Sequence, residues 1–388
     1  MPASSHNREE QPRDDAGAVA QRSPAAASPD RAPGGIETPE GFDPFELATV
    51  LSHYDLGVID AIHAFPRGSP TSPKALIRSE RGRFLLKRRS EGASSLERIL
   101  FTHRVQLQLA ERAFPLPRLL GTRHTNSSVL EWRGGLYEVY VFVQGVPFVA
   151  SAAHAHAAGA ALANLHAALA DFDTSSAPRL LRGYHARSDL PSQLGVIPDR
   201  VSSVQPDAPA VARTTLAGAV SNLRDAYTLA CENADRANAS QWPAQVIHGD
   251  WHPGNLLFTK QNGVAAALDY DAARIEPRAF DLANGALQFS ITRGESDPDN
   301  WPASPDYSRL RVFVRGYDGD EPHRISEAEL AALPWLMIEA LIVEAVAPVA
   351  ATGSFARMEG GAFIRMVERK VRWLQENANS LQRILDSP

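Results

Sequence analysis

The chain has 388 residues, 44% of them hydrophobic and 22% charged, and its formal net charge at pH 7 is −6. This length allows a large hydrophobic core and predicts two lobes. The mild negative charge excludes a chain-wide basic field, so composition gives no reason to expect nucleic acid or an anionic membrane surface as a partner.

Cysteine usage and hydropathy indicate the compartment. The single cysteine, Cys231, cannot form an internal disulfide, which fits a reducing environment, and we expect it to be a small buried side chain in a helix. Charged residues such as Glu339 and Glu344 interrupt the apolar runs before these approach the ~20 residues that a membrane-spanning helix needs. We therefore expect a soluble, cytoplasmic protein without a membrane partner.

The first forty residues are rich in Ala, Pro, Ser, Asp and Arg and contain almost no large apolar side chains. Such a segment cannot bury enough apolar surface to offset the entropy cost of ordering, so we expect a disordered tail over residues 1–40. The segment also lacks the apolar stretch of a signal peptide.

Short strands around one longer helix are predicted for residues 41–145. Gly82 separates two strand-like segments, which predicts a hairpin with Lys87 near the end of its second strand. The helix ends where Pro115 and Pro117 follow it. In chain order we expect a helix at 45–51, strands from residues 58, 75 and 83, a helix at 94–112, and strands at 128–132 and 136–143.

The composition becomes helix-rich beyond residue 145, which places a boundary between two lobes there, at 41–145 and 146–388. The interval 173–209 is polar and contains prolines, so we expect a long loop or an insertion. The other expected elements are an alanine-rich helix at 152–172, a helix at 211–238, short strands at 245–247 and 264–268, and mainly helices over 280–385.

The strongest functional signal is the segment 248–255, which reads HGDWHPGN. Asn255 follows Asp250 by five residues, which is the spacing of a kinase catalytic loop, where the Asp accepts the proton of the acceptor hydroxyl and the Asn coordinates Mg²⁺. Asp269 follows a predicted strand and can supply a second metal ligand. Phosphoryl transfer needs this combination, because cations stabilise the transferred charge and a carboxylate must reach the nucleophile.

This loop and the sequence LDYD at 268–271 resemble the aminoglycoside phosphotransferase and choline kinase superfamily. Supporting matches are the LANLH segment at 162–166 and Tyr317, and the resemblance covers residues from about 45 to about 360. It implies an α+β, protein-kinase-like bilobal fold, with a small antiparallel-sheet N-terminal lobe that binds nucleotide and a larger, mainly helical C-terminal lobe that binds the acceptor. The implied activity is that of a small-molecule kinase, which transfers the γ-phosphate of ATP to a hydroxyl or an amine.

The resemblance also assigns roles within the catalytic loop. Asp250 is expected to be the catalytic base or the carboxylate that orients the acceptor, and His248 and His252 are expected to support the loop. Asn255 and Asp269 are the expected Mg²⁺ ligands. Superfamily members phosphorylate aminoglycosides, choline, ethanolamine, homoserine, methylthioribose and fructosamines, and no residue here selects one of these acceptors.

The nucleotide-binding half of the implied site is less regular. Lys87 is expected to hold the α- and β-phosphates, and the backbone near Val141 and Val143 to meet the adenine. The helix position that carries a lysine-pairing glutamate in related proteins is occupied by His103, so either another carboxylate replaces that glutamate or nucleotide binding is poor. The expected nucleotide-covering loop at 65–70 has one glycine and no GxGxxG pattern.

Two other interpretations stay open. His248, Asp250 and His252 could converge on zinc, as in a metallohydrolase, but no further ligand motif is obvious, and Asn255 and Asp269 would then have no role. A non-catalytic binding protein with a kinase-like fold is the main alternative, and the histidine at position 103 and the unusual nucleotide loop favour it.

Several other side chains are candidates for lesser roles. Asp271 could assist the metal, meet a cationic substrate or be a simple loop carboxylate, and it favours a cationic or amine-bearing acceptor. Asp281 matches a superfamily position that anchors the catalytic loop. Trp335 and Glu339 share one face of a helix, where we expect a packed tryptophan and, with Glu344, exposed acids. Packing is the expected role of the three helical histidines, His154, His156 and His166.

Overall fold

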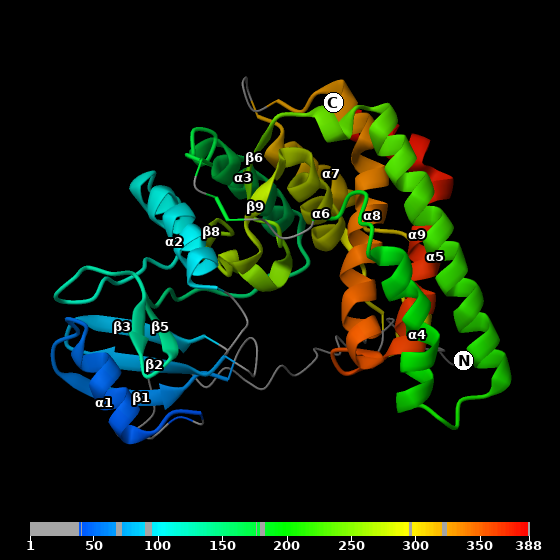
Figure 1. The fold of residues 1–388 in the computed structure, drawn as a ribbon. Helices are drawn as coiled ribbons and strands as arrows, with labels where there is room; N and C mark the ends of the chain where they lie inside the picture. Colours follow the sequence, from blue (N-terminus) through cyan, green and yellow to red (C-terminus); the bar gives the residue numbers. More distant parts are fainter. Residues whose placement is uncertain are drawn as a thin grey trace, which may run out of the picture.

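The structure is a computed structural model that describes residue 39 and residues 41–66, 72–89, 95–175, 177–178, 183–294, 297–319 and 324–386. The described chain forms two lobes, one built on a β-sheet and one mainly helical (Figure 1). The expected α+β bilobal fold is therefore confirmed. The predicted tail lies outside the described residues except for Pro39, and so does most of the predicted nucleotide loop.

The N-terminal lobe is a five-stranded antiparallel sheet in the order β1-β2-β3-β5-β4. The predicted hairpin around Gly82 is confirmed, and this glycine has a φ of +129°, a conformation that glycine adopts without steric cost. The strands are β1 (Ile59–Ala64), β2 (Lys74–Ser79), β3 (Gly82–Arg88), β4 (Leu130–Trp132) and β5 (Gly135–Val141), and the helices are α1 (Pro44–Ser52) and α2 (Leu96–Glu111).

Strand register and helix packing place the charged residues of this lobe. Lys87 on β3 lies opposite Glu138 on β5, and directly opposed residues of an antiparallel pair share one face of the sheet. Helix α2 begins after Ser95, whose side chain accepts a hydrogen bond from the backbone N–H of Arg98. The apolar face of α2 joins the core of the helical lobe, so this helix lies between the sheet and the C-terminal lobe (Figure 1).

The C-terminal lobe contains seven described helices and three small two-stranded sheets. Strands β6 and β9 pair with each other, as do β7 and β8, and β10 and β11. The helices are α3 (Ala152–Ala168), α4 (Leu190–Val204), α5 (Ala210–Arg236), α6 (Arg278–Ser290), α7 (Tyr307–Tyr317), α8 (Glu327–Thr352) and α9 (Gly360–Asp386). The strands are β6 (Ala244–Ile247), β7 (Leu256–Phe258), β8 (Val264–Ala267), β9 (Arg274–Pro277), β10 (Ser354–Phe355) and β11 (Met358–Glu359).

The expectation of a loop over 173–209 was wrong in its second half, because α4 occupies residues 190–204. The prolines were misleading: Pro191 lies in the first turn, where its missing N–H costs nothing. The buried side chains of α4 recur at helical spacing, and their burial outweighs the cost of Pro198 inside the helix. They are Leu190, Leu194, Ile197 and Val201.

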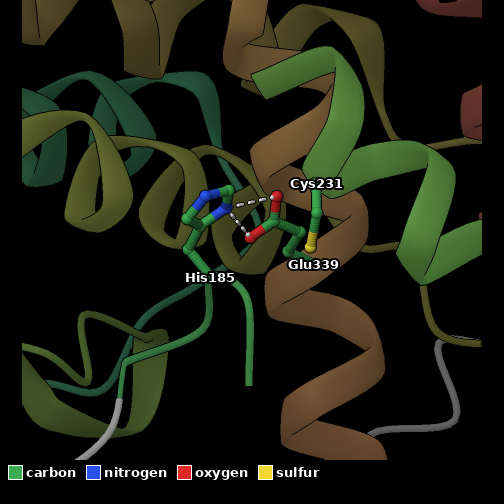
Figure 2. Close-up of side chains that lie close together, drawn as sticks. All are labelled: His185, Cys231 and Glu339. Carbon is green, nitrogen blue, oxygen red and sulfur yellow. Dashed lines mark hydrogen bonds and ion pairs between the residues drawn. The ribbon is translucent and has the colours of Figure 1, made fainter. Parts of the chain in front are cut away.

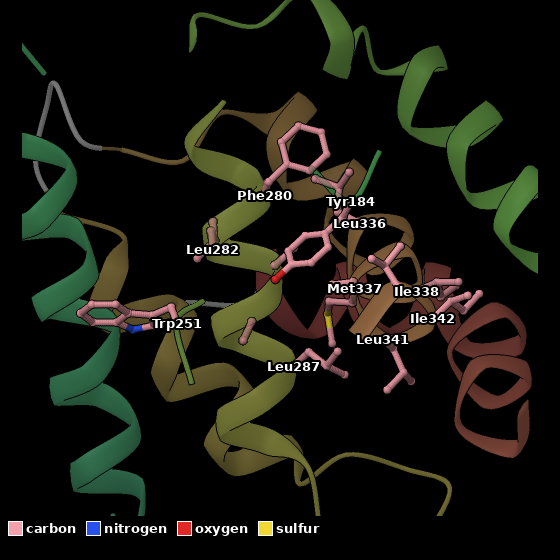
Figure 3. Close-up of a cluster of buried hydrophobic side chains, with 14 of the residues drawn as sticks. Tyr184, Trp251, Phe280, Leu282, Leu287, Leu336, Met337, Ile338, Leu341 and Ile342 are labelled. Atoms are coloured by element: carbon pink, nitrogen blue, oxygen red, sulfur yellow. The ribbon is translucent and has the colours of Figure 1, made fainter. Parts of the chain in front are cut away.

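Helix α8 runs through the centre of the C-terminal core. Its apolar side chains pack against those of α6 and lie near the ring of Tyr184, whereas Trp251 lies on the other side of α6 (Figure 3). By length and composition α8 is the one helix of the described chain that could cross a membrane, but 72% of its most apolar window is buried inside the protein. A core helix of a globular protein has this same character.

Helices α3 and α7 touch backbone to backbone through two glycines. A Cβ atom on Gly159 would lie 2.0 Å from the carbonyl oxygen of Phe313, and one on Gly316 would lie 2.2 Å from that of His156. Any side chain at these positions therefore pushes the helices apart. This close packing sets the position of Tyr317 at the end of α7, which contacts the support of the catalytic loop described below.

We predict that Gly159→Ala destabilises the protein by roughly 1–3 kcal/mol or more, because the added methyl group overpacks the contact between α3 and α7. Urea denaturation measures the change. The matched control is Gly218→Ala in α5, where an added Cβ meets nothing within 4 Å, and there the better helix propensity of alanine should stabilise by about 1 kcal/mol. Equal effects of the two substitutions would contradict the close contact.

Candidate active site

The catalytic loop begins where β6 ends, and a buried carboxylate holds its first turn. Asp281, near the start of α6, accepts hydrogen bonds from the backbone N–H of His248 at 2.6 Å and of Gly249 at 2.8 Å. Gly249 has a φ of +79°, and a Cβ there would lie 2.2 Å from the carbonyl oxygen of Ala272. Only glycine fits this turn, and the predicted anchoring position of Asp281 has the contacts that such a role needs.

Asp281 is itself contacted by His166, which is held in turn by Tyr317. His166 of α3 places Nε2 at 3.3 Å from Asp281 Oδ2, and its Nδ1 lies 2.7 Å from the Tyr317 hydroxyl. Burial would raise the pKa of Asp281, but the hydrogen bond and charge of His166 lower it below its usual range. The carboxylate therefore stays ionised and keeps accepting from the loop, and His166 is a buried core histidine, as expected.

Asp250 and Asn255 face each other across the loop. The amide Nδ2 of Asn255 donates to Asp250 Oδ2 at 2.9 Å and to the Asp250 carbonyl oxygen at 3.0 Å. His252 Nε2 lies 3.5 Å from Asp250 Oδ2, and His252 Nδ1 accepts from the backbone N–H of Gly254. Burial raises the pKa of Asp250, but His252, His248 and Asn255 outweigh it and lower that pKa, so the carboxylate is ionised at neutral pH.

His248 and Trp251 fix the loop from behind. Burial lowers the pKa of His248, so its imidazole is neutral, with Nε2 donating to the Leu268 carbonyl oxygen at 3.0 Å. Its Nδ1 accepts from the backbone N–H of Asp250. The fully buried Trp251 donates through Nε1 to the Ala158 carbonyl oxygen on α3. These contacts fit the loop-supporting role predicted for His248.

The β7–β8 hairpin brings the two predicted metal ligands together. Leu256 pairs with Ala267, and the N–H of Leu268 donates to the carbonyl oxygen of Asn255 at 2.8 Å. Asn255 and Asp269 therefore flank the same end of the hairpin. Because Nδ2 of Asn255 is used within the loop, its Oδ1 is available as a ligand, and Asp269 is exposed with no side-chain hydrogen bond to any described residue. A carboxylate and an amide oxygen suit Mg²⁺.

Lys87 has a carboxylate partner, and this partner comes from the other lobe. Its Nζ lies 3.2 Å from Asp271 Oδ2, and Arg89 Nη1 lies 2.5 Å from the same oxygen. Burial would raise the pKa of Asp271, but Lys87 and Arg89 lower it to about 2. Arg98 of α2 donates to the backbone carbonyl oxygen of Asp271 as well. Asp271 therefore connects the two lobes, and its charge is already balanced.

The histidine at position 103 is explained by a rearranged ion-pair network. His103 Nε2 lies 2.5 Å from Oε1 of Glu138, a fully buried carboxylate on β5, and Arg89 binds both oxygens of the same carboxylate at 2.7 and 2.8 Å. The glutamate of this network thus lies on the strand, and a histidine occupies the helix position. Of the two outcomes expected for Lys87, replacement of the missing glutamate by another carboxylate is the one found, with Asp271 as that carboxylate.

In the segment that joins the lobes, the backbones of Val141 and Val143 differ in their hydrogen bonding. The N–H of Val141 donates to the Arg118 carbonyl oxygen, so it is already satisfied. The backbone of Val143 makes no hydrogen bond with any described residue, which leaves its N–H and C=O available to an adenine edge. The predicted contact is therefore better supported at Val143 than at Val141.

A cavity of about 460 Å³ opens beside Asp250. Tyr184, Arg274 and Glu344 line it, and sequence analysis gave none of them a role in acceptor binding. The Tyr184 hydroxyl lies 2.6 Å from Glu344 Oε1 and 3.1 Å from the carbonyl oxygen of Gly249. Arg274 donates to that same carbonyl oxygen, while its Nη2 is buried and has no partner among the described residues.

The expectation of exposed acids on α8 was wrong. Glu339 is fully buried against His185, and Glu344 is half-buried in the wall of the cavity. The signal for both was present in the sequence, because an acid in the middle of an apolar helix must find a partner. Trp335 does pack against the core, as expected.

The geometry does not support a zinc-dependent hydrolase site at the catalytic loop. Among the residues that the structure describes, His185, Cys231 and Glu339 are the one set of three whose ligand atoms lie within 4.8 Å of one another. His248 and His252 do not join Asp250 in such a set. Both histidines instead use ring nitrogens to hold the loop backbone.

Comparison with known proteins agrees with this geometry. The sequence model of the phosphotransferase enzyme family matches residues 65–323. A homoserine kinase of Bradyrhizobium diazoefficiens is 27% identical over 297 residues, which cover 75% of this chain and 79% of that protein. A homoserine kinase of Caulobacter vibrioides is 26% identical and covers 75% of this chain and 82% of that protein.

Solved structures share the fold at lower sequence identity. A microcompartment-associated aminopropanol kinase superimposes with a TM-score of 0.61 at 14% identity, over 88% of this chain and 99% of that one. The amicoumacin kinase hAmiN, in complex with AMP-PNP, Ca²⁺ and its ligand, superimposes with a TM-score of 0.58 at 13% identity, over 87% and 94% of the two chains.

We predict that Asp271→Asn flattens the acid end of the stability profile. The pKa of Asp271 is about 2 in the folded protein and ~3.9 when unfolded, so its ion pairs stabilise above about pH 4 and are lost as pH falls towards 2. Urea unfolding between pH 5 and 2.5 measures the slope. Asp318→Asn, at the C-terminal end of α7, is the control, and a slope unchanged by Asp271→Asn would contradict the interlobe contact.

Proposed function

The chain belongs to the phosphotransferase enzyme family, and from that premise we propose that Asp250 orients and deprotonates an acceptor hydroxyl for attack on the γ-phosphate of ATP. The chain is a small-molecule kinase that uses ATP. The observation that carries the proposed role is the position of an ionised Asp250 on the wall of the cavity, hydrogen-bonded to Asn255.

The site residues act by positioning. Asp250 Oδ2 is held by Asn255 and faces His252, so Oδ1 is left for the acceptor hydroxyl. Oδ1 accepts the hydroxyl proton as the acceptor oxygen bonds to the γ-phosphorus and the bond from that phosphorus to the leaving oxygen of ADP breaks. Asn255 and Asp269 would hold Mg²⁺, which when bound neutralises phosphate charge. Lys87 would contact the α- and β-phosphates from β3, and Val143 would offer its free backbone to the adenine. The N-terminal lobe at 41–145 would thus bind nucleotide, and the C-terminal lobe at 146–388 the acceptor.

We further propose that the acceptor is homoserine or a close analogue, an alcohol that carries both an ammonium and a carboxylate. Glu344 lines the cavity, and burial raises the pKa of its carboxyl group, so a bound ammonium would be a favourable partner. The unpaired Nη2 of Arg274 is a donor for a carboxylate. The sequence suggested Asp271 as the partner of a cationic acceptor, but Lys87 and Arg89 already balance that carboxylate. Glu344 would bind the ammonium group of the acceptor instead.

The homoserine kinases among the relatives support the same acceptor. We also propose that the enzyme is soluble and cytoplasmic, as sequence analysis predicts. The alternative of a non-catalytic binding protein rested on the histidine at position 103 and on the unusual nucleotide loop, most of which lies outside the described residues. Because Lys87 is paired with Asp271 and Asp281 holds the first turn of the catalytic loop, the first of these two reasons is weakened.

We predict that Asp250→Asn lowers kcat by a factor of at least 10²–10⁴, because the amide cannot accept the acceptor proton. A coupled ADP-release assay with homoserine measures turnover, and titration with Mg-ATP should show nucleotide affinity close to that of the wild type. Asp225→Asn on the exposed face of α5 is the control. Wild-type turnover in Asp250→Asn would disprove the assignment, and absence of Mg-ATP binding in the wild type would favour the non-catalytic alternative.

We predict that removing either charged group of the acceptor costs roughly 10- to 100-fold in kcat/KM, since a hydrogen bond to a charged group contributes about 1.5–3 kcal/mol. The compounds to compare are homoserine, 4-hydroxybutanoate, which lacks the ammonium, and 3-aminopropan-1-ol, which lacks the carboxylate. Glu344→Gln should lower kcat/KM for homoserine but leave that for 4-hydroxybutanoate nearly unchanged. Glu327→Gln, at the exposed start of α8, should change neither.

The acceptor proposal fails if 4-hydroxybutanoate and homoserine are equally good substrates of the wild type, or if Glu344→Gln affects both to the same extent. The first result would remove the ammonium from recognition. The second would make Glu344 a support for Tyr184 and not a contact to the acceptor.

A further inference from the structure

Three side chains of residue types that bind metals, from separate elements, lie close together (Figure 2). His185 comes from the segment before α4, Cys231 from α5 and Glu339 from α8. One ligand atom of each lies within 4.8 Å of the others, and His185 Nδ1 is 3.0 Å from both carboxylate oxygens of Glu339. None of the three takes part in the proposed phosphoryl transfer.

The burial of Glu339 distinguishes this cluster from a chance grouping of exposed side chains. Glu339 has no exposed surface and lies in the middle of an apolar helix, where an ionised carboxylate requires a cation. A metal ion held between Glu339, His185 and Cys231 would supply that cation.

The second ring nitrogen of His185, Nε2, makes the contact that metal-binding histidines usually make with their other nitrogen. His185 Nε2 lies 3.2 Å from Oδ1 of Asp235, one turn along α5 from Cys231. Metal-binding histidines usually donate their other N–H to a carboxylate, which fixes the ring and selects the tautomer. Here that contact leaves Nδ1 directed at Glu339 and Cys231.

We propose that His185, Cys231 and Glu339 form a zinc site, with water as the fourth ligand. A thiolate, an imidazole and one carboxylate are the donors that zinc takes, whereas Mg²⁺ prefers oxygen ligands alone. Tetrahedral zinc with bonds of about 2.0–2.3 Å sets its ligand atoms roughly 3.3–3.7 Å apart, which small side-chain shifts reach from the observed arrangement. Binding releases the thiol proton of Cys231 and the second imidazole proton of His185 to solvent.

The bound metal would cross-link elements that form the wall of the acceptor cavity. Tyr184 precedes His185, and its hydroxyl contacts Glu344 and the catalytic-loop carbonyl of Gly249. The metal would join the Tyr184 segment to α5 and α8. Zinc is therefore structural here, separate from the Mg²⁺ that the kinase reaction uses, and its binding can be measured without any acceptor or ATP.

The test is zinc titration of the purified, metal-stripped full chain by calorimetry in millimolar Mg²⁺, which occupies the oxygen-ligand site. We expect one zinc per chain and a higher melting temperature in its presence. Cobalt(II) in place of zinc should give a near-ultraviolet thiolate-to-metal absorption band. Cys231→Ser should abolish this band and weaken zinc binding at least 10-fold.

Two further variants complete the experiment. Asp235→Asn keeps all three ligands but removes the carboxylate that orients His185, and should weaken zinc binding roughly 10- to 100-fold. Glu232→Gln, which is exposed and adjacent to Cys231, should bind zinc as the wild type does. The proposal is overturned if the wild type binds no zinc at about 100 μM, or if Cys231→Ser and Asp235→Asn bind it as tightly as Glu232→Gln. If the wild type binds zinc but does not phosphorylate homoserine, that result would count against the proposed acceptor alone.

Discussion

The active site depends on the buried carboxylate of Asp281. A turn that carries a glycine with positive φ leaves two adjacent backbone N–H groups without partners, and Asp281 accepts from both. Leaving these donors unpaired in a protein interior would cost about 1–3 kcal/mol each. Helix α6 holds the carboxylate, and His166 and Tyr317 connect it to α3 and α7. The packing of three helices therefore fixes the direction in which Asp250 points.

The charged network between the lobes can form with its acidic and basic residues at different chain positions. In the nucleotide half, the acids are Glu138 on β5 and Asp271 after β8, and the bases are Lys87, Arg89 and His103. Glu138 contacts Arg89 and His103, Asp271 contacts Lys87 and Arg89, and Arg89 therefore contacts both acids. Because buried charges must be paired but the chain position of the partner is free, a histidine on α2 is compatible with a glutamate on β5.

Helix α8 links the acceptor cavity with the candidate zinc cluster. Two of its acids, Glu339 and Glu344, contact consecutive residues of one segment, His185 and Tyr184. The cavity wall is thus held from the core of the C-terminal lobe and not from the sheet. A change of acceptor could arise here through the residues of this segment, without altering the catalytic loop that Asp281 supports.

The sequence by itself predicted the bilobal fold, through its composition and the family resemblance. It predicted the reaction class and the candidate catalytic loop because Asp250, Asn255 and Asp269 lie at spacings that local structure preserves. A tight turn and a hairpin place these residues whatever surrounds them. The hairpins of the sheet and most helices followed from glycine turns and apolar periodicity in the same way.

Only the tertiary structure decided the partners of Lys87 and His103 and the composition of the acceptor cavity. Asp271 lies 184 residues from Lys87, and His185 lies 154 residues from Glu339. Helix α4 was missed because its prolines concealed an apolar stripe that matters only against α8 and α5. Long-range pairing of buried charge follows the packing of whole elements, and no local pattern in a single sequence encodes that packing.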